Sequence, residues 1–256
     1  MTAIERADSH HEVVDVAGGD RRPRVLMVVA NPGTSTTTGW PVGFWAAELF
    51  HPLFEFIRAR YEVTIASPDG GPVAMDALSD PRDPSRWSAD DVISMGSINM
   101  PEIMDPLQDT PALAGLDLEA FDALVVCGGQ GPMFQFREHP ALKRAIARFY
   151  EAGKPTAALC HGVSGLIDVT LSDGSFLVEG RTVTGFANVE EDFGDAAAGV
   201  TIMPYRVEDE LRARGANYIQ AGLFKAFAVR DQNLITGQQQ YSGAKVAALV
   251  IDALGV

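Results

Sequence analysis

Cysteine, positive charge and long apolar runs are all scarce in this chain. Two cysteines among 256 residues do not form a disulfide framework, which favours a reducing cytoplasm. Twenty basic residues against 34 acidic ones give a net charge of −14, and this balance disfavours nucleic acid and anionic membrane surfaces as partners. No apolar run approaches the roughly 20 residues that span a bilayer. The first residues are polar and lack the apolar core of a signal peptide. We therefore expect a cytoplasmic protein with neither nucleic acid nor membrane partners.

The chain is long enough to bury one large core. Its first segment, residues 1–22, is polar and predicts a flexible N-terminal tail. Residues 23–256 contain no internal repeat and no linker that would divide them, so they are predicted to form a single domain. His10 and His11 lie in the tail, and we interpret them as solvated because no further ligand set accompanies them.

Strand-like and helix-like segments alternate along the chain. Apolar runs predict strands at residues 24–30, 61–66, 124–127, 155–159, 181–184, 226–229 and 234–235. Helical spacing predicts helices at residues 43–60, 140–152, 208–214 and 242–254. Residues 76–115 are predicted to be an irregular connection, long enough to cap a site. This order is typical of an α/β protein with a doubly wound, mostly parallel sheet sandwiched by helices, here with a small cap from inserted segments.

A short apolar run ends abruptly at Cys160, and His161 and Gly162 follow before a second apolar segment. This order predicts a strand, a nucleophile elbow that carries the thiol, and the start of a helix. Free N–H groups and the dipole at a helix N-terminus lower the pKa of a thiol, so we interpret Cys160 as a nucleophile. We expect the side chains of Cys160 and His161 to diverge at the tight turn. Cys127 ends another apolar strand and is interpreted as a core cysteine.

A thiol nucleophile needs a proton-handling partner within hydrogen-bond reach. Glu48 is a lone carboxylate in an apolar stretch of the first helix, and burial there would raise its pKa and suit it to transfer protons. The carboxyl ends of parallel strands meet at one edge of a sheet, which brings the Gly128–Gly131 turn toward Cys160. The N–H groups of that turn could stabilise an oxyanion. Nucleotide binding is not expected, because no GxGxxG sequence opens a helix after the first strand.

Six segments carry motifs in a common order along the chain. They are Gly-x-x-x-x-Glu-x-x-His-Pro at residues 43–52 and further motifs at 62–71, 121–129, 158–162, 184–191 and 208–216. Together they resemble the ThiJ/PfpI superfamily, whose fold is like that of class I glutamine amidotransferases. The most similar branch is the glyoxalase III and heat-shock chaperone group. This resemblance implies that Cys160 is the nucleophile, Glu48 the acid/base and His161 the neighbouring catalytic histidine. It places Glu191 where the branch carries another active-site glutamate.

The chemistry that the resemblance implies uses no cofactor and no metal. A thiolate adds to an aldehyde to form a thiohemiacetal, Glu48 moves a proton between adjacent carbons, and the product leaves as a hydroxy acid. The expected partners are a small-molecule carbonyl substrate and a second copy of the chain in a homodimer. The residues assigned to substrate binding are Gly128, Gly129, Gln130, Gly162 and Glu191.

Four features depart from the pattern of the branch. Gln130 replaces the histidine of a Gly-Gly-His-Gly turn, and Gln135 stands where an acidic residue is expected. Val163 replaces a proline, and the Gln-Gln-Gln-Tyr sequence at residues 238–241 replaces a turn that contains Asn-Pro. Three of the four lie in loops expected to face the pocket. Because the proton-transfer residues are kept while their polar surroundings change, we expect a substrate other than methylglyoxal, larger or more apolar.

Two alternatives remain open. One is hydrolysis or hydration of an amide, imine or isocyanide, although isocyanide hydratases usually pair the cysteine with an aspartate rather than a glutamate. The other is a holding chaperone or redox-sensing stress protein, in which Cys160 acts only as a sensor. A proteolytic role is disfavoured because no orienting aspartate is identified for His161. Enzymatic readings predict that Cys160→Ser abolishes turnover and leaves the fold intact.

Overall fold

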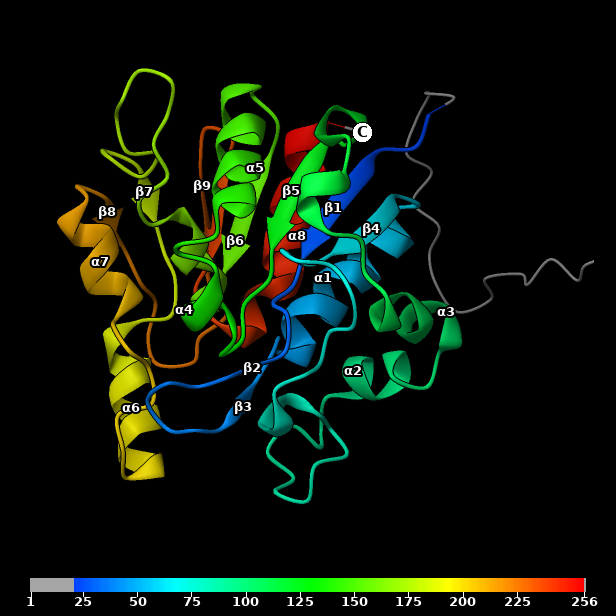
Figure 1. The fold of residues 1–256 in the computed structure, drawn as a ribbon, viewed down its shortest axis with the longest axis vertical. Coiled ribbons are helices and arrows are strands. Elements are labelled where there is room, and N and C mark those ends of the chain that lie inside the picture. The colour runs from blue at the N-terminus through cyan, green and yellow to red at the C-terminus, as the bar shows by residue number, and fades with distance from the viewer. Residues whose placement is uncertain (1–20, 256) are drawn as a thin grey trace, which may run out of the picture.

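A computed structural model describes residues 21–255, whose arrangement is shown in Figure 1. His10, His11 and most of the predicted tail lie outside the described residues. The boundaries predicted for the tail and the domain therefore stay predictions.

A six-stranded sheet forms the centre of the fold, in the strand order β4-β1-β5-β6-β10-β9. Its strands are β1 (Arg24–Val28), β4 (Glu62–Ala66), β5 (Ala123–Val126), β6 (Thr156–Leu159), β9 (Ala228–Asp231) and β10 (Leu234–Gly237). All neighbours pair in parallel except β9, which runs antiparallel along β10 at one edge. Every residue of β5 and β6 is buried, as expected for central parallel strands covered on both faces. The predicted doubly wound, mostly parallel sheet is confirmed.

Helices cover both faces of this sheet (Figure 1). Successive side chains of β1 point to opposite faces, so that Val25 and Met27 belong to one apolar cluster and Leu26 and Val28 to the other. The first cluster is closed by α1 (Ala46–Arg58) and α8 (Gly243–Leu254). The second is closed by α4 (Pro132–Gln135), α5 (Pro140–Glu151) and α7 (Val207–Ala213). Within residues 21–255, none of the helices combines the length and apolar character that crossing a bilayer requires.

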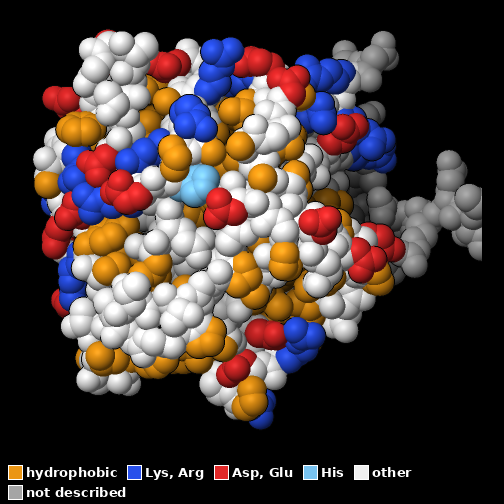
Figure 2. Space-filling view, in the orientation of Figure 1, with side chains coloured by type: hydrophobic (Ala, Val, Ile, Leu, Met, Phe, Trp, Pro, Cys, Tyr) orange, Lys and Arg blue, Asp and Glu red, His pale blue; other side chains and the backbone are white. Residues whose placement is uncertain are grey.

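The carboxyl ends of the parallel strands point toward one edge of the molecule, the lower one in Figure 1. Around this edge lie the hairpin of β2 (Gly33–Thr34) and β3 (Pro41–Val42), the segment that leads into α2 (Val92–Ser97), and α6 (Asn188–Ala198). These inserted segments form the predicted cap. Apolar side chains are exposed over α6 and the hairpin, at the lower left of the face in Figure 2.

The prediction of an irregular connection over residues 76–115 is wrong. This segment contains α2, α3 (Pro101–Met104) and 3-10 turns at residues 77–79, 105–108 and 113–115. Asp91 caps α2 by accepting a hydrogen bond from Ser94 N at 3.0 Å. The elements are too short to give a helical apolar period, which explains why pattern reading missed them.

Other elements differ from the prediction as well. The short elements β2, β3, β8 (Asn217–Tyr218) and α4 are not predicted, and β9 begins two residues later than expected. The expected strand at residues 181–184 is β7 (Thr182–Val183), which pairs with β8 in a separate two-stranded sheet.

Helix α6 is missed because its buried residues are two glutamates, whereas Val189 and Phe193 are exposed, so no buried apolar stripe with helical spacing marks it. The sequence feature that marks α6 lies at its N-terminus. There Glu190 Oε2 accepts a hydrogen bond from Ala187 N at 3.0 Å, as in half of a capping box.

We predict that Ile146→Ala, in α5, lowers the free energy of unfolding by about 2–5 kcal/mol, because Ile146 is fully buried and its loss leaves a cavity. The matched control is Arg144→Ala on the exposed side of the same helix, with an expected change within about 0.5 kcal/mol. Urea denaturation followed by circular dichroism measures both. Equal effects of the two variants would contradict the placement of this face of α5 against the sheet.

Candidate active site

Cys160 lies in a strained turn at the carboxyl end of β6. Its φ is 54°, in the left-handed region that non-glycine residues rarely adopt, as in a nucleophile elbow. The predicted turn is confirmed. The segment that follows is a 3-10 helix, Cys160–Leu166, and not an α-helix. With two glycines among seven residues, this segment has low helix propensity, so the thiol lacks the long, aligned dipole that was expected.

Two glycines allow the strand ends to approach the nucleophile. A Cβ on Gly128 would stand 2.3 Å from Glu48 Oε2 and 2.9 Å from Cys160 Cβ. A Cβ on Gly162 would stand 2.6 Å from Val126 O. Neither glycine lines the cavity described below, so their predicted role in substrate binding is replaced by a packing role. They leave room for the carboxyl and the thiol to lie side by side.

Glu48 is fully buried in the first turn of α1. Burial raises the pKa of this carboxyl well above its usual range, as predicted, and the nearby charge of Asp76 adds to the effect. Neither carboxyl oxygen has a hydrogen bond of normal geometry to the described residues. The Cys160 thiol and the Gly128 N–H nevertheless lie close enough to lower the pKa of Glu48 in part. Glu48 therefore keeps a proton at pH values at which a solvated glutamate is ionised.

The prediction of a lowered pKa for Cys160 is wrong. Burial raises the pKa of the thiol, and the negative charge of an ionised Glu48 raises it further, whereas the His161 N–H lowers it. Because Glu48 and Cys160 interact, the loss of a proton from one changes the pKa of the other. The two titration steps are therefore properties of the pair and not of either residue alone. While Glu48 holds its proton it adds no charge beside the sulfur. The O–H group of the protonated Glu48 carboxyl can then donate a hydrogen bond to the Cys160 thiolate.

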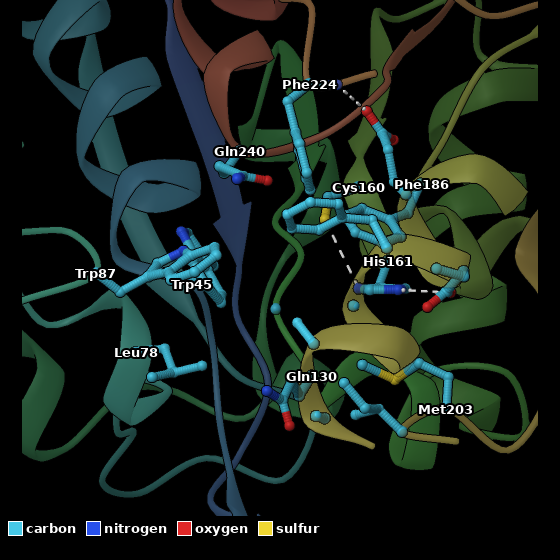
Figure 3. A pocket seen from close by; sticks show the side chains of 18 of the residues that line it. Trp45, Leu78, Trp87, Gln130, Cys160, His161, Phe186, Met203, Phe224 and Gln240 are labelled. Carbon is cyan, nitrogen blue, oxygen red and sulfur yellow. Dashed lines mark hydrogen bonds and ion pairs between the residues drawn. The ribbon is translucent and has the colours of Figure 1, made fainter. Parts of the chain in front are cut away.

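His161 connects the thiol to a second carboxylate. Its Nδ1 lies 3.7 Å from Cys160 Sγ, and its Nε2 lies 3.0 Å from Glu191 Oε1 (Figure 3). The prediction that the side chains of Cys160 and His161 diverge is therefore wrong. No orienting aspartate is identified from the sequence, but the carboxylate of Glu191 occupies that position beside His161. His161 and Glu191 are both buried, and the ring of Phe186 packs 4.3 Å from the imidazole centroid to centroid. With the Nε2 proton donated to Glu191, Nδ1 is the nitrogen that can accept the thiol proton.

The Gly128–Gly131 turn has fewer free N–H groups than predicted for an oxyanion site. Gln130 N donates to Asp76 Oδ2 at 2.7 Å, and Gly131 N donates to Gly43 O at 2.8 Å. Gly128 N faces the Glu48 carboxyl. Among the described residues this leaves the N–H of Gly129 without an acceptor. Within this turn, Gly129 N–H is therefore the group that remains available to donate to an oxyanion.

Asp76 is a site residue that sequence reasoning missed. It is buried, and its two carboxyl oxygens accept hydrogen bonds from Gly43 N and Gln130 N, each at 2.7 Å. Burial raises its pKa to about 7. Asp76 therefore joins the loop before α1 to the turn after β5. Nothing in the sequence distinguishes it from the other aspartates of residues 76–115.

Glu190 was also missed. Its Oε1 accepts hydrogen bonds from Gln238 Nε2 at 2.8 Å and from Phe224 N at 2.9 Å.

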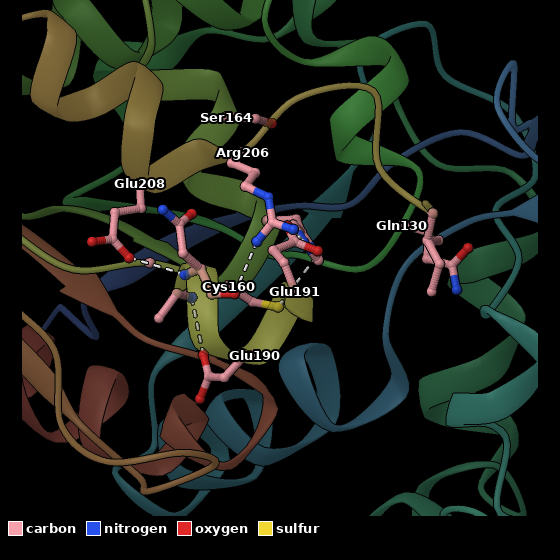
Figure 4. Close-up of polar contacts among 12 residues, drawn as sticks. Gln130, Cys160, Ser164, Glu190, Glu191, Arg206 and Glu208 are labelled. Atoms are coloured by element: carbon pink, nitrogen blue, oxygen red, sulfur yellow. Dashed lines mark hydrogen bonds and ion pairs between the residues drawn. The ribbon is translucent and has the colours of Figure 1, made fainter. Parts of the chain in front are cut away.

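Two further side chains hold the start of α6 through the backbone of Asn188 (Figure 4). Arg206 donates to Asn188 O, and Glu208 accepts from Asn188 N, each at 2.9 Å. These contacts fix α6 beside the Cys160 turn.

The four departures from the family pattern have different locations. Gln130 and Gln240 line the cavity, as expected. Gln135 instead donates to Asn31 O at 2.7 Å and is not among the lining residues. Val163 is fully buried against Gly185, where it fills space rather than contacting substrate.

A cavity of about 340 Å³ opens in front of Cys160 (Figure 3). Its wall includes the predicted site residues Glu48, Gly129, Gln130, Cys160, His161 and Glu191. The rest is largely apolar: Trp40, Trp45, Leu78, Trp87, Phe186, Phe193, Ile202, Met203 and Phe224. In the part of the chain that the structure describes, no three His, Cys, Asp or Glu side chains are grouped so that they could hold a metal ion.

The fold and the site together define a class: α/β proteins in which a cysteine on a strained turn after a central parallel strand contacts a histidine and a buried glutamate. The model of the DJ-1/PfpI family matches residues 42–252. The chain belongs to this family, as the motifs predicted.

Three similar proteins cover nearly the whole chain. Glyoxalase 3 of Candida albicans is 27% identical over 238 residues, which cover 90% of this chain and 97% of that protein. The glutathione-independent glyoxalase HSP31 of Saccharomyces cerevisiae is 26% identical over 233 residues, covering 84% and 91%. The crystal structure of the Rapid Encystment Protein 24 KDa of Francisella tularensis has a TM-score of 0.81 at 25% identity, covering 91% of this chain and 99% of that one.

We predict a pH-dependent effect of Asp76→Asn on stability. Asparagine offers one acceptor oxygen to two N–H groups, so the variant is expected to be about 1–3 kcal/mol less stable near pH 5. The folded pKa of Asp76, about 7, lies above its ordinary value of 3.8. Between these values the folded state binds the extra proton, so the stability that Asp76 contributes falls as pH rises toward 7 and is constant above it.

The advantage of the wild type over the variant should therefore shrink between about pH 5 and pH 8. Urea denaturation across this range measures the difference. Asp90→Asn, on the exposed surface of the same segment, is the control. A constant difference would contradict the raised pKa.

Proposed function

We propose that this protein is a cysteine-dependent, cofactor-independent enzyme that converts a 2-oxoaldehyde to a 2-hydroxy acid, in the manner of glyoxalase III. The observation that carries the proposal is the joint position of Cys160, Glu48 and His161 at one end of the cavity. The names of two relatives, glyoxalase 3 and glutathione-independent glyoxalase, support it.

The first step is addition of sulfur to the aldehyde. His161 Nδ1, 3.7 Å from Sγ, accepts the thiol proton as the S–C bond forms. The aldehyde π electrons move to the oxygen atom and give it a negative charge. We assign stabilisation of this oxyanion to the backbone N–H groups of His161 and Gly129. Glu191 holds the imidazole in the required tautomer at 3.0 Å. The imidazolium then gives the former thiol proton to the alkoxide oxygen, which completes a thiohemiacetal on Cys160 and leaves His161 neutral.

Proton transfer between the two carbons follows. Glu48 first gives its proton to the neighbouring ketone oxygen, and the resulting carboxylate removes the proton of the former aldehyde carbon, which forms an enediol. The same carboxyl then returns a proton to the neighbouring carbon and takes back the hydroxyl proton of the former aldehyde carbon. Glu48 suits this task because its raised pKa lets it release and bind protons closer to neutral pH. The result is a thioester of a 2-hydroxy acid, which water hydrolyses to the free acid and the thiol. The net change is addition of one water, so no external oxidant or reductant is required.

A second candidate is hydrolysis of an amide or ester. The alignment of Cys160, His161 and Glu191 favours it, because cysteine hydrolases use a histidine oriented by a third polar group. In that reaction the thioester forms directly from the substrate, and Glu48 has no proton to move between carbons. The requirement for Glu48 therefore separates the two candidates.

We predict that Cys160→Ser abolishes conversion of 2-oxoaldehydes to 2-hydroxy acids and that Glu48→Gln lowers kcat about 10²–10⁴-fold. Chromatography of the hydroxy acid measures turnover. The rate at which iodoacetamide alkylates Cys160 near neutral pH should differ only a few-fold between Glu48→Gln and the wild type, because an uncharged amide replaces a protonated carboxyl. Cys127→Ala, at a fully buried cysteine, is the matched control with turnover retained.

Full turnover by Cys160→Ser would show that the thiol is not the nucleophile and would reject the proposal. Turnover by Glu48→Gln on an ester or amide, with none on 2-oxoaldehydes, would favour the hydrolytic candidate instead.

We predict that Glu191→Gln lowers kcat about 10- to 100-fold with little change in KM, because the amide keeps an acceptor for His161 but loses the charge that stabilises an imidazolium. Asp192→Asn, at the exposed neighbour on α6, should leave both parameters unchanged. An unaffected kcat in Glu191→Gln would mean that His161 does not take up the proton.

A further inference from the structure

The cavity is larger than a three-carbon carbonyl compound requires. Its volume is about 340 Å³, whereas one water occupies about 30 Å³ in the liquid. A compound such as methylglyoxal would leave much of the wall in contact with water. Volumes of about 300–1,000 Å³ are typical of sites that enclose larger organic ligands. The size therefore favours a substrate with a bulky substituent.

All three tryptophans of the chain lie on the wall of this cavity: Trp40, Trp45 and Trp87. Trp45 directly precedes α1, whereas the other two come from the β2–β3 hairpin and from the segment before α2. Trp45 and Trp87 lie together on the side opposite His161 in Figure 3. Trp40 is 40% and Trp87 50% exposed, so indole surface is available to a ligand. Indoles pack well against flat, apolar groups.

A row of phenylalanines faces the tryptophans. It begins at Phe186, which packs on His161, and continues to Phe224 with a centroid distance of 6.4 Å. Phe193 then meets Phe224 edge to face, at 5.3 Å and 86°. Phe193 is 42% exposed at the outer end of the row. The row leads from the catalytic histidine toward solvent, so a ligand attached to Cys160 would extend along it.

The polar groups of the cavity select against negative charge. Beyond the catalytic residues, two uncharged amides reach the wall, Gln130 and Gln240. Glu190 and Glu191 supply carboxyl groups, and no lysine or arginine is among the described residues that line the wall. An anionic substituent would have no cation to pair with there. The Oε1 atom of Gln130 is buried with no partner in residues 21–255, which leaves an acceptor for a hydroxyl or amide group of a ligand.

We infer that the substrate carried by Cys160 is an uncharged aryl-substituted 2-oxoaldehyde, with its ring between the tryptophan and phenylalanine walls. This inference rests on the proposed function, since it places the aldehyde carbon at Sγ. The reaction is the one derived above, in which water adds overall and an aryl 2-hydroxy acid leaves.

The test compares phenylglyoxal with methylglyoxal under identical conditions, with Cys160→Ser as the blank for non-enzymatic loss. Mandelate and lactate are quantified by chiral chromatography. The expected result is a kcat/KM at least about tenfold higher for phenylglyoxal, because the ring buries apolar surface that a methyl group does not reach. A kcat/KM for methylglyoxal equal to or above that for phenylglyoxal would overturn the inference and leave the proposed function standing. No Cys160-dependent product from either compound would reject the proposed function itself.

A pair of variants tests the location of the ring. Phe193→Ala, at the outer end of the row, should raise KM for phenylglyoxal about tenfold with kcat nearly kept, and it should affect methylglyoxal less. Phe176→Ala, at a similarly exposed phenylalanine outside the cavity, should change neither substrate's parameters. Equal effects of Phe193→Ala on both substrates would show that the ring does not lie along this row.

Discussion

The close approach of two strand ends determines the rest of this site. Where β5 and β6 leave the sheet, the space that a Cβ on Gly128 would occupy is already taken by Glu48, by Leu159 O and by the Cβ of Cys160. A Cβ on Gly162 would likewise meet the backbone at the end of β5. Because interiors are packed without spare volume, a carboxyl and a thiol can be this close only where both neighbours lack a side chain. The close contact between Cys160 and Glu48 thus follows from backbone packing.

Buried carboxyl groups then divide into two kinds. Asp76 and Glu190 each accept hydrogen bonds from backbone N–H groups of separate segments, and so hold the loops around the cavity in place. Glu48 has no such bond of normal geometry. A buried carboxyl without partners destabilises the fold. The raised pKa of Glu48 suits the proton transfer that we propose, so the structure gives up some stability at a position that the proposed reaction would use.

The proposed reacting groups and the aromatic walls of the cavity lie on different parts of the molecule. Cys160 and Glu48 lie at the ends of β6 and α1, which belong to the sheet and the helix packed on it. Apart from Trp45, which directly precedes α1, the aromatic walls come from segments at the edge of the sheet: the hairpin, the segment before α2, α6 with the residues just before it, and the loop between β8 and β9. Inserted segments can change without disturbing the core. This separation explains how a family can keep its thiol chemistry while the shape and polarity of the cavity differ.

The sequence by itself determined the central strands, because strands buried on both faces must be apolar throughout, and it determined the Cys160 turn and the burial of Glu48 within an apolar stretch. The tertiary structure alone decided the contacts between distant segments. Asp76 bonds to residues 33 and 54 positions away, and Glu190 to one 48 positions away. The 3.7 Å contact between Cys160 and His161 depends on the φ of a strained residue, and the three tryptophans line one cavity only after folding. Local patterns record periodicity and composition, whereas such contacts depend on how the whole chain closes around its core.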